Sequence, residues 1–210
     1  MATEKLDTRI RREQIAQAAL DLAARGGLKK VSMAAVARRV GLVPSALYRH
    51  FKGKEEVLDA TLELIQDRLL DNVGSVCRQT DDAVERLRCL LIRHARMIRE
   101  NRGIPQILFS QDLYVECPAR RGRVYEGIRR YLAEVARIIR EGQEMGQISR
   151  ALDPQAASVL FLGLIQPSAI LWHLSDGDFD VMRQTQRAWP LFLKAIQDGV
   201  KSPEGKRDLQ

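Results

Sequence analysis

Basic and aromatic side chains gather in one short stretch of this sequence, LYRHFKGK, at residues 47–54. On a helix, Leu47 and Phe51 lie four residues apart and face the interior, which leaves the opposite side polar and basic. Guanidinium, ammonium and phenol groups on one exposed face can bind phosphates and the edges of bases. The side chains expected on this face are Ser45, Tyr48, Arg49 and Lys52.

Two short helices joined by a glycine turn are expected to position this face. Ser32 is a good N-cap for a helix over 33–40, Gly41 ends that helix, and Pro44 suits the first position of the next one. A helix of seven or eight residues is too short to be stable alone, so the second of the two must pack on a support. Helix, turn and short helix predict a helix-turn-helix, whose second helix enters the major groove of DNA.

Positive charge is concentrated in the same part of the chain. The first 54 residues hold 12 Lys and Arg against 4 Asp and Glu, whereas the rest of the chain holds 22 against 23. The net charge of +7 therefore comes from the N-terminal quarter. A basic module on a near-neutral body favours a polyanion bound at one end, with solubility alone as the alternative explanation.

At these residues the sequence resembles the tetracycline-repressor (TetR) family of bacterial regulators. The matching features are A-x-R-x-G-x at 37–42, LYRHF at 47–51 and the K-x-K-E-E-V-L that follows. I-x-x-A-A-L-x-L at 15–22 and the glycine pair at 26–27 match as well. The resemblance is close up to about residue 65, and beyond it only the layout agrees. It implies a homodimer that binds a palindromic DNA operator and holds a small molecule in its helical body.

The resemblance also assigns roles to single positions. Tyr48, Lys54 and Ser32 match positions that contact the phosphate backbone, and Lys54 would add its charge to the positive end of a helix. Arg49 could pair with guanine, and the apolar residues before it could touch thymine methyl groups. His50 has a structural, hydrogen-bonded role as its alternative, and Tyr48 a half-buried one. The expected DNA-binding residues are Ser32, Val43, Pro44, Ser45, Ala46, Tyr48, Arg49, His50, Lys52 and Lys54.

Apolar residues recur at helical spacing through the chain, and no convincing alternating strand pattern occurs. The sequence therefore predicts an all-α fold of about nine helices. We expect a helix-turn-helix DNA-binding domain over 8–53, a helical effector-binding and dimerisation domain over 54–200, and a polar tail over 201–210. The expected helices cover about 8–24, 33–40, 44–51, 54–73, 82–99, 105–110, 118–145, 154–174 and 179–198, with kinks at Pro167 and Pro190.

A ligand pocket among the middle helices follows from the resemblance, and an apolar small-molecule effector is expected in it. Apolar side chains with a few polar ones suit such a site. The same residue types also build a helical core, which is the alternative for each of them singly. The candidates are His94, Met97, Ile98, Leu108, Phe109, Tyr114, Tyr131 and Phe161.

The last two long helices carry more apolar surface than the core of one domain needs. A partner related by a two-fold axis would cover that surface, so we expect these helices to pair with their symmetry mates. The candidates for this dimer interface are Leu160, Leu164, Leu171, Trp172, Trp189, Phe192 and Ile196.

The residues give little support to an enzyme. His50, His94 and His173 lie far apart on different helices, and the chain has no nucleophile elbow, P-loop or HExxH motif. Two other DNA-binding classes stay open as alternatives. A ligand-independent regulator would look the same in sequence, and a non-specific DNA binder would rely on phosphate contacts alone.

The three cysteines, Cys77, Cys89 and Cys117, form an odd set without metal-ligand spacing. Reduced thiols in a cytosolic protein are therefore expected, with a redox-sensing pair as the alternative. The N-terminal segment MATEKLDTRIRREQ lacks the apolar region of a signal peptide, and the longest apolar run, 159–172, is too short for a bilayer. The sequence predicts a cytoplasmic protein with no metal, cofactor or membrane partner.

Overall fold

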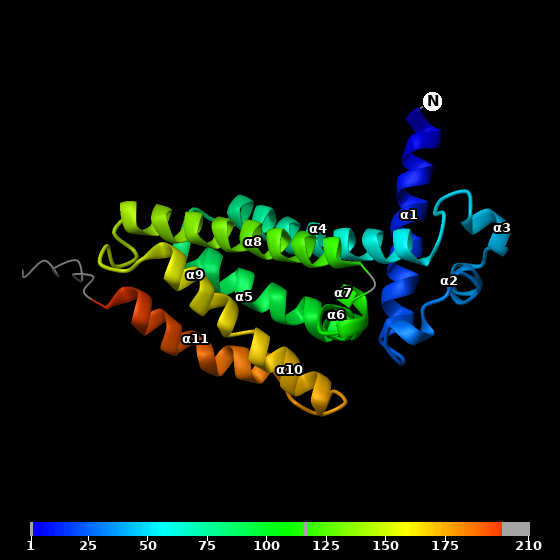
Figure 1. The fold of residues 1–210 in the computed structure, drawn as a ribbon. Helices are drawn as coiled ribbons and strands as arrows, with labels where there is room; N and C mark the ends of the chain where they lie inside the picture. The colour runs from blue at the N-terminus through cyan, green and yellow to red at the C-terminus, as the bar shows by residue number, and fades with distance from the viewer. Residues whose placement is uncertain (1, 116, 199–210) are drawn as a thin grey trace, which may run out of the picture.

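The chain folds into helices in a computed structural model. The structure describes residues 2–115 and 117–198, with side chains described from Thr8 onward. No strand occurs within these ranges, and the predicted all-α fold is confirmed. Figure 1 shows a small group of N-terminal helices at one end of a long helical body. The polar tail expected over 201–210 lies outside the described residues.

The N-terminal group, which we term the head, comprises α1 (Ala2–Ala23), a short 3-10 helix η1 (Leu28–Lys30), α2 (Met33–Val40) and α3 (Pro44–Leu47). The bounds of α2 are those predicted. Ser32 Oγ accepts a hydrogen bond from the N–H of Ala35 at 3.2 Å, and Gly41 closes the helix at φ 75°. A left-handed closing residue of this kind favours glycine.

The third helix is shorter than the predicted 44–51. The N–H groups of Arg49 and His50 bond to carbonyl groups three residues back, which tightens the chain after Leu47 into a turn. The N–H of Phe51 again bonds four residues back, to the carbonyl of Leu47 at 3.1 Å. Leu47 and Phe51 therefore keep a common inward direction although the helix has ended.

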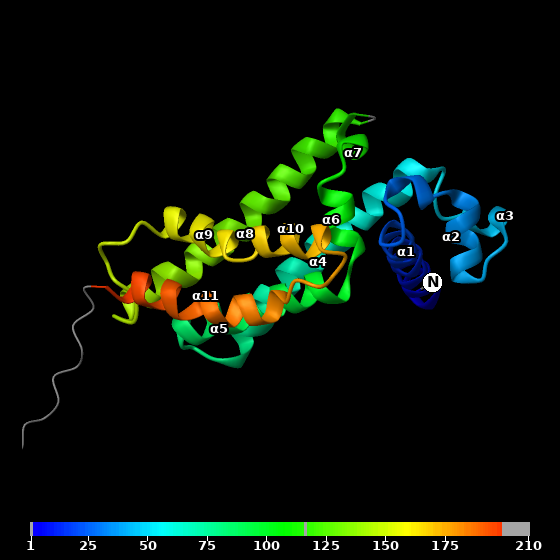
Figure 2. The same cartoon turned by 90° about the horizontal axis from the view of Figure 1, so that it is seen from below.

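The body contains longer helices, several of which are capped by aspartate. Asp82, Asp153 and Asp180 each accept a hydrogen bond from a backbone N–H in the first turn of their helix. In the view of Figure 2, α10 and α11 lie in front of α4 and α8. The body helices are α4 (Lys54–Gln79), α5 (Ala83–Glu100), α6 (Gly103–Leu108), α7 (Gln111–Val115), α8 (Pro118–Glu144), α9 (Pro154–Gly163), α10 (Gln166–Leu174) and α11 (Val181–Gln197).

Two body segments differ from the prediction. Helix α7 was not predicted, and the single kinked helix expected over 154–174 is two helices that part at Leu164 and Ile165. Pro167 stands in the first turn of α10, where its missing N–H leaves no helical bond unmade. The stretch Pro154–Leu174 is apolar and long enough to cross a membrane. Here it is broken in two and packs against α8 and α11.

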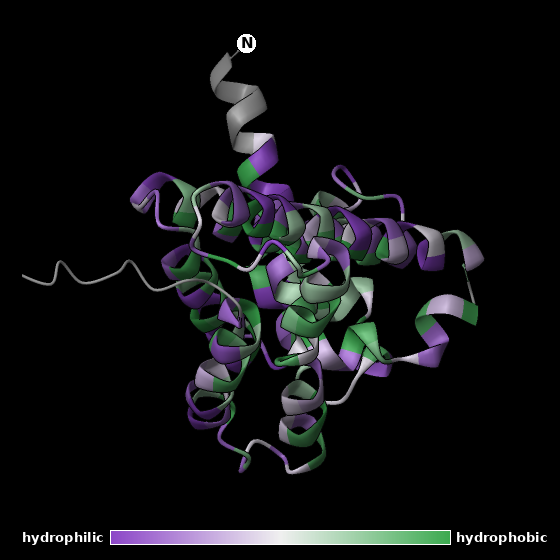
Figure 3. Ribbon diagram, turned by 90° about the vertical axis from the view of Figure 1, so that its left-hand side faces the viewer, coloured by the Kyte–Doolittle hydropathy of each residue, from purple (hydrophilic) through white to green (hydrophobic). Residues whose placement is uncertain are grey.

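The apolar core of the head does not stop at the predicted domain boundary after residue 53. Leu47 and Phe51 share one cluster with Val57 and Leu58 of α4, and the same cluster takes in Ile107 of α6. A second cluster fills the body between α4, α5, α8 and the last three helices. Figure 3 shows both hydrophobic and hydrophilic turns along the body helices, as amphipathic helices around a core require.

The start of α6 lies directly against the end of α1. A Cβ atom added to Gly103 would lie 2.1 Å from the carbonyl oxygen of Leu20. No side chain fits at this position, so only glycine allows the two backbones to approach so closely. Gly103 is thus a contact between head and body that is separate from the chain connection at α4.

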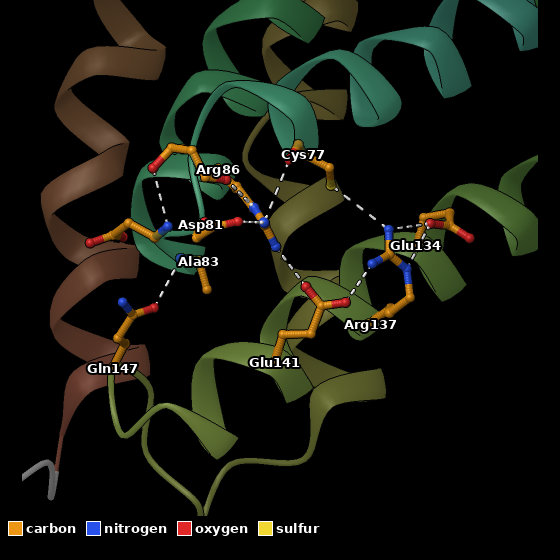
Figure 4. Close-up of polar contacts among 10 residues, drawn as sticks. Cys77, Asp81, Ala83, Arg86, Glu134, Arg137, Glu141 and Gln147 are labelled. Carbon is orange, nitrogen blue, oxygen red and sulfur yellow. Dashed lines mark hydrogen bonds and ion pairs between the residues drawn. The ribbon is translucent and has the colours of Figure 1, made fainter.

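Helices α4 and α8 run side by side in the same direction (Figure 1) and are joined by polar groups at the end far from the head. Figure 4 shows this far-end cluster. Arg86 of α5 donates to Glu141 of α8 at 2.6 Å and to Asp81 at 3.0 Å. Arg137 of α8 donates to the same Glu141 and reaches the sulfur of Cys77 at 3.7 Å. These contacts join the end of α4, the start of α5 and the end of α8.

Candidate nucleic-acid interface and ligand cavity

The short helix α3 and the turn after it divide their side chains between two sides. Leu47 and Phe51 are fully buried, whereas Tyr48 is 53% exposed and Arg49 is exposed beside it. Ser45 and Lys52 are exposed as well. The structure therefore brings the basic and aromatic groups to one outer surface, which we term the reading face.

The start of α3 differs from the expectation at one residue. Val43, Pro44 and Ser45 are exposed, but Ala46 is only 8% exposed. Its methyl group belongs to the supporting side together with Leu47, because the first turn of α3 rotates this position inward. Ala46 offers no side-chain surface to a base, and we remove it from the candidate readers.

Arginine from α1 fixes the reading face from behind. The guanidinium of Arg12 lies 4.0 Å from the ring centre of Phe51 and donates a hydrogen bond to the carbonyl of His50. The His50 side chain is half-buried, and its pKa is lowered by burial and by the positive charges of Arg11, Arg49 and Arg12. A neutral imidazole in this position fits the structural alternative for His50 better than a phosphate contact.

The beginning of α4 completes the face. Lys54 is the first residue of α4 and is partly exposed, and Ser32 is exposed at the start of α2. The N–H of Lys52 donates to the carboxylate of Glu56 at 2.9 Å, which fixes the turn that leads into α4. A lysine at a helix N-terminus combines its charge with that of the helix dipole, which is an arrangement that suits a phosphate.

A cavity of about 70 Å³, which is less open than the other hollows described in this structure and which we term the enclosed cavity, lies within the body. Six of the eight residues expected to line a ligand pocket do line it: His94, Met97, Ile98, Leu108, Phe109 and Tyr131. The sequence did not single out the remaining lining residues. They are Ile65, Leu69, Ile104, Pro105, Ile128, Leu162, Gln166 and Ala169.

The two other expected pocket residues lie elsewhere. The hydroxyl of Tyr114, on α7, donates to the carbonyl of Leu108 at 2.7 Å, so this side chain is held outside the lining. Phe161 is fully buried and packs edge-on against Phe192 with 5.6 Å between ring centres. Phe161 is a core residue, which was the alternative reading for each of these positions.

Two polar side chains meet within the lining. His94 Nδ1 and the Tyr131 hydroxyl are 3.1 Å apart, and both residues are buried. Burial lowers the pKa of His94 to about 4 and raises that of Tyr131. Both groups are therefore uncharged at neutral pH, because the charged forms would have to be stripped of water.

A larger open groove of about 690 Å³ lies between α1 and α4. Its lining mixes the guanidinium groups of Arg9, Arg12 and Arg68 with the carboxylates of Glu63 and Asp67. An open groove of mixed charge keeps its groups in water and does not enclose a ligand. The enclosed cavity is therefore the better candidate for a small-molecule site.

Comparison with known protein families gives two matches along the chain. A model of the bacterial regulatory proteins of the tetR family matches residues 15–61, and a model of the tetracyclin repressor-like C-terminal domain matches residues 80–196. The chain belongs to the TetR family. It is accordingly a DNA-binding transcription regulator with a helix-turn-helix, and the reading face lies within the first matched segment.

Proteins similar to this chain match most of its length. The chain is 26% identical over 198 residues to the nucleoid occlusion factor SlmA of Escherichia coli O1:K1, covering 94% of this chain and 100% of SlmA. The structure of SmeT, the repressor of the Stenotrophomonas maltophilia multidrug efflux pump SmeDEF, has a TM-score of 0.71 at 23% identity and covers 97% and 99% of the two chains. FadR from Bacillus subtilis, in complex with stearoyl-CoA, has a TM-score of 0.70 at 20% identity and covers 87% and 98%.

Only some of the residues expected to form the interface between two protomers are exposed. Trp172, Phe192 and Ile196 are buried in the protomer's own core, where they pack with the other buried residues of the body. Leu164 and Trp189 are partly buried, and Leu160 and Leu171 are exposed. Further exposed apolar side chains on these helices are Val159, Ile170, Leu174 and Leu191.

One buried arginine was not among the expected site residues, and it joins the body to α4 next to the head. Arg120, near the start of α8, is 1% exposed and donates to Asp59 at 2.7 Å and to the carbonyl of Glu55 at 3.0 Å. Arg123 donates to the same Asp59 carboxylate at 2.8 Å. Arg120 Nη1 has no hydrogen-bond partner among the described residues. No local signal identifies this residue, because its partners lie about sixty positions earlier in the chain.

Proposed function

We propose that this TetR-family regulator is a ligand-responsive repressor. It binds a palindromic operator as a homodimer in the cytoplasm and is released when a small, largely apolar effector enters the enclosed cavity. The proposal gives the chain no catalytic role.

The course of α4 carries this proposal. The helix begins with Lys54 beside the reading face, and Ile65 and Leu69 on the same helix line the cavity. Fifteen helical residues separate Lys54 from Leu69, which is about 22 Å. A ligand that enlarges the cavity displaces the middle of α4 and thereby tilts its first turn. Two heads of a dimer must sit about one turn of DNA apart, so a small tilt is enough to favour a state that cannot bind.

The reading face supports the DNA-binding part of the proposal. Tyr48, Lys54 and Ser32 would contact phosphates, and Lys52 adds to the field. Arg49 is free to reach a guanine in the major groove, while Val43 and Pro44 offer apolar contacts to thymine methyl groups. His50 supports the face through its backbone.

The proposed dimer surface is revised to the exposed apolar residues of the last three helices. Leu160 and Leu171 remain, and Val159, Leu174 and Leu191 are added. Leu191→Asp should shift the protein from dimer to monomer in sedimentation, because a carboxylate would be buried in the interface. Val115→Asp is the matched control, since Val115 is equally exposed but lies beside the head on α7. A dimer that survives Leu191→Asp excludes this surface.

The release step is tested with DNA from the promoter region beside the protein's own gene. Binding is measured by fluorescence anisotropy against a panel of small apolar metabolites. We expect at least one compound to weaken binding, and Leu69→Trp, which fills the cavity, to remove that response while DNA binding persists. Leu70→Trp is the control, because Leu70 is on the same helix but outside the cavity lining. If no compound acts and both variants bind DNA like the wild type, the ligand-responsive function is rejected.

A second candidate function is DNA binding without a small-molecule response. It is favoured by the full-length similarity to a protein named as a nucleoid occlusion factor. A non-specific binder depends on phosphate contacts and hardly distinguishes one sequence from another. Competition between promoter DNA and random DNA separates the two, since equal competition supports this candidate.

A further inference from the structure

The lining of the enclosed cavity contains no carboxylate, ammonium or guanidinium group. Charged residues make up 29% of the chain, so about four would be expected among fourteen lining residues. None of the lining residues is Asp, Glu, Lys or Arg. The four other cavities described in this structure each include at least three such residues. The enclosed cavity therefore has an uncharged lining in a protein that is otherwise rich in charged residues.

The His94–Tyr131 pair gives this cavity its main polar function. A neutral imidazole has one donor and one acceptor, and a phenol hydroxyl can do both. Their mutual hydrogen bond uses one donor and one acceptor. Whichever of the two groups donates, the pair keeps one donor and one acceptor for a third partner. Neither side chain has another hydrogen-bond partner among the residues that the structure describes.

We propose that the cavity binds a neutral, largely apolar molecule with a single hydroxyl or carbonyl group, which hydrogen-bonds to the His94–Tyr131 pair. A molecule with the same skeleton and a carboxylate or an ammonium group is rejected. This inference rests on the proposed function only in taking the cavity as the effector site.

The rejection of ions follows from desolvation. A buried carboxylate or ammonium needs an opposite charge or several strong hydrogen bonds to replace its water. The lining has no opposite charge, and the depressed pKa of His94, about 4, keeps the imidazole from becoming a cation at neutral pH. Gln166 is the one further polar side chain of the lining, and its amide is neutral too.

The cavity also limits the size of the group that it encloses. Its 70 Å³ is less than the roughly 150 Å³ of a cavity known to hold benzene, so a ring must displace some of the lining. Met97 and the half-exposed Phe109 are side chains able to move. A compact phenol is therefore a suitable probe.

The experiment compares four probes that share one ring: phenol, toluene, benzoate and benzylammonium. Their affinities for the full-length protein are measured at neutral pH by ligand-observed NMR, without DNA. We expect phenol to bind about tenfold or more tightly than either ion, because each ion would be buried without a partner. Benzoate or benzylammonium binding as tightly as phenol would overturn the inference, and so would failure of phenol to bind at millimolar concentration.

Three variants locate the binding and assign the polar pair. Tyr131→Phe should weaken phenol several-fold and leave toluene unchanged, which a general loss of packing would not do. Ile128→Trp fills the cavity and should abolish the binding of both, with Tyr125→Trp as the exposed control on the same helix. Leu162→Phe replaces Ile128→Trp if the latter does not fold. An unchanged phenol preference in Tyr131→Phe contradicts the proposed hydrogen bond.

The outcome is independent of the repressor function. If phenol shows the expected preference and no compound releases DNA, the proposed function fails and the ligand class stands. If an anionic metabolite releases DNA and Leu69→Trp abolishes that effect, the function stands and the ligand class is wrong.

Discussion

The reading face and the enclosed cavity lie about 22 Å apart along α4, and they differ in the chemistry of their side chains. The face presents Arg49, Lys52 and Lys54 to water on a frame of two buried side chains, Leu47 and Phe51. The cavity has no charged lining residue and holds its two main polar groups, His94 and Tyr131, inside the core. Helix α4 contributes to both.

Because of this difference, DNA binding at the reading face should respond to salt, whereas the stability of the cavity region should respond to pH. Interactions of exposed charges with DNA weaken with salt because bound counterions are released on binding. An uncharged, buried site is nearly indifferent to salt but sensitive to acid, because a buried imidazole resists protonation. A variant at the face should therefore alter DNA binding with little effect on stability, and a variant at the cavity should do the reverse.

The largest effect is expected from His94 as the pH falls. Its native pKa of about 4 lies below the ordinary 6.5, so the unfolded chain binds a proton that the native state refuses. The stability is complete above about pH 6.5 and is lost as the pH falls towards 4, in total by about 3 kcal/mol. Urea unfolding of the wild type and of His94→Leu at several pH values in this range tests the prediction. The slope of the free energy of unfolding against pH should be smaller in the variant.

A residual slope of the same sign is expected in His94→Leu, because the pKa of His50 is lowered as well. Equal slopes in wild type and His94→Leu would show that the cavity is not the acid-sensitive region and would break the comparison.

The next effect concerns Arg120, which lies between the two regions. Arg120→Met should lower the free energy of unfolding by about 2 kcal/mol, less than a fully buried pair would lose, because Asp59 and Glu55 are partly exposed. Arg123→Met is the matched control, since Arg123 binds the same Asp59 from a half-exposed position. It should cost well under 1 kcal/mol. Similar losses in both variants would contradict the importance of the buried guanidinium.

A smaller effect is expected at the face itself. Arg49→Ala should reduce the discrimination at one base pair in each half-site, near the lower end of the about 1–3 kcal/mol of a bidentate guanine contact. The melting temperature should stay the same. Anisotropy with single-base operator variants measures this, and Arg38→Ala, exposed on α2, serves as the control. A uniform loss on all sequences would assign Arg49 to phosphate.

The smallest effect is expected for Lys54→Ala. Affinity should fall on every DNA sequence alike, and the slope of log affinity against log salt should decrease by roughly one unit per protomer. Lys194→Ala, at the far end of α11, should leave the slope unchanged. A slope that is the same in wild type and Lys54→Ala removes Lys54 from the phosphate contacts.

The sequence predicts the head better than the cavity, for a physical reason. Ser32 and Gly41 are local signals of helix ends, and the four-residue spacing of Leu47 and Phe51 determines which side of α3 turns inward. Ala46 was misplaced because α3 is shorter than expected and its first turn brings this small apolar residue to the buried side beside Leu47. These are properties of a few neighbouring residues, which a sequence contains directly.

The cavity depends on packing between distant segments. Ile65 and Leu69 recur at helical spacing on α4, and nothing in that spacing distinguishes a side chain that lines a cavity from one that fills the core. Arg120 was equally invisible, because its partners are on another helix. The break before α10 did have a local signal, Pro167, which was interpreted as a kink.

Gly103 has a consequence for how the two ends of the molecule communicate. The start of α6 touches the last turn of α1 backbone to backbone, and the next two residues of α6, Ile104 and Pro105, belong to the cavity wall. Because no side chain separates the two backbones, we expect a displacement of that wall to be transmitted directly to α1. Helix α1 thus contacts both α4 and α6, and we expect the orientation of the head to depend on the cavity wall and on α4 together.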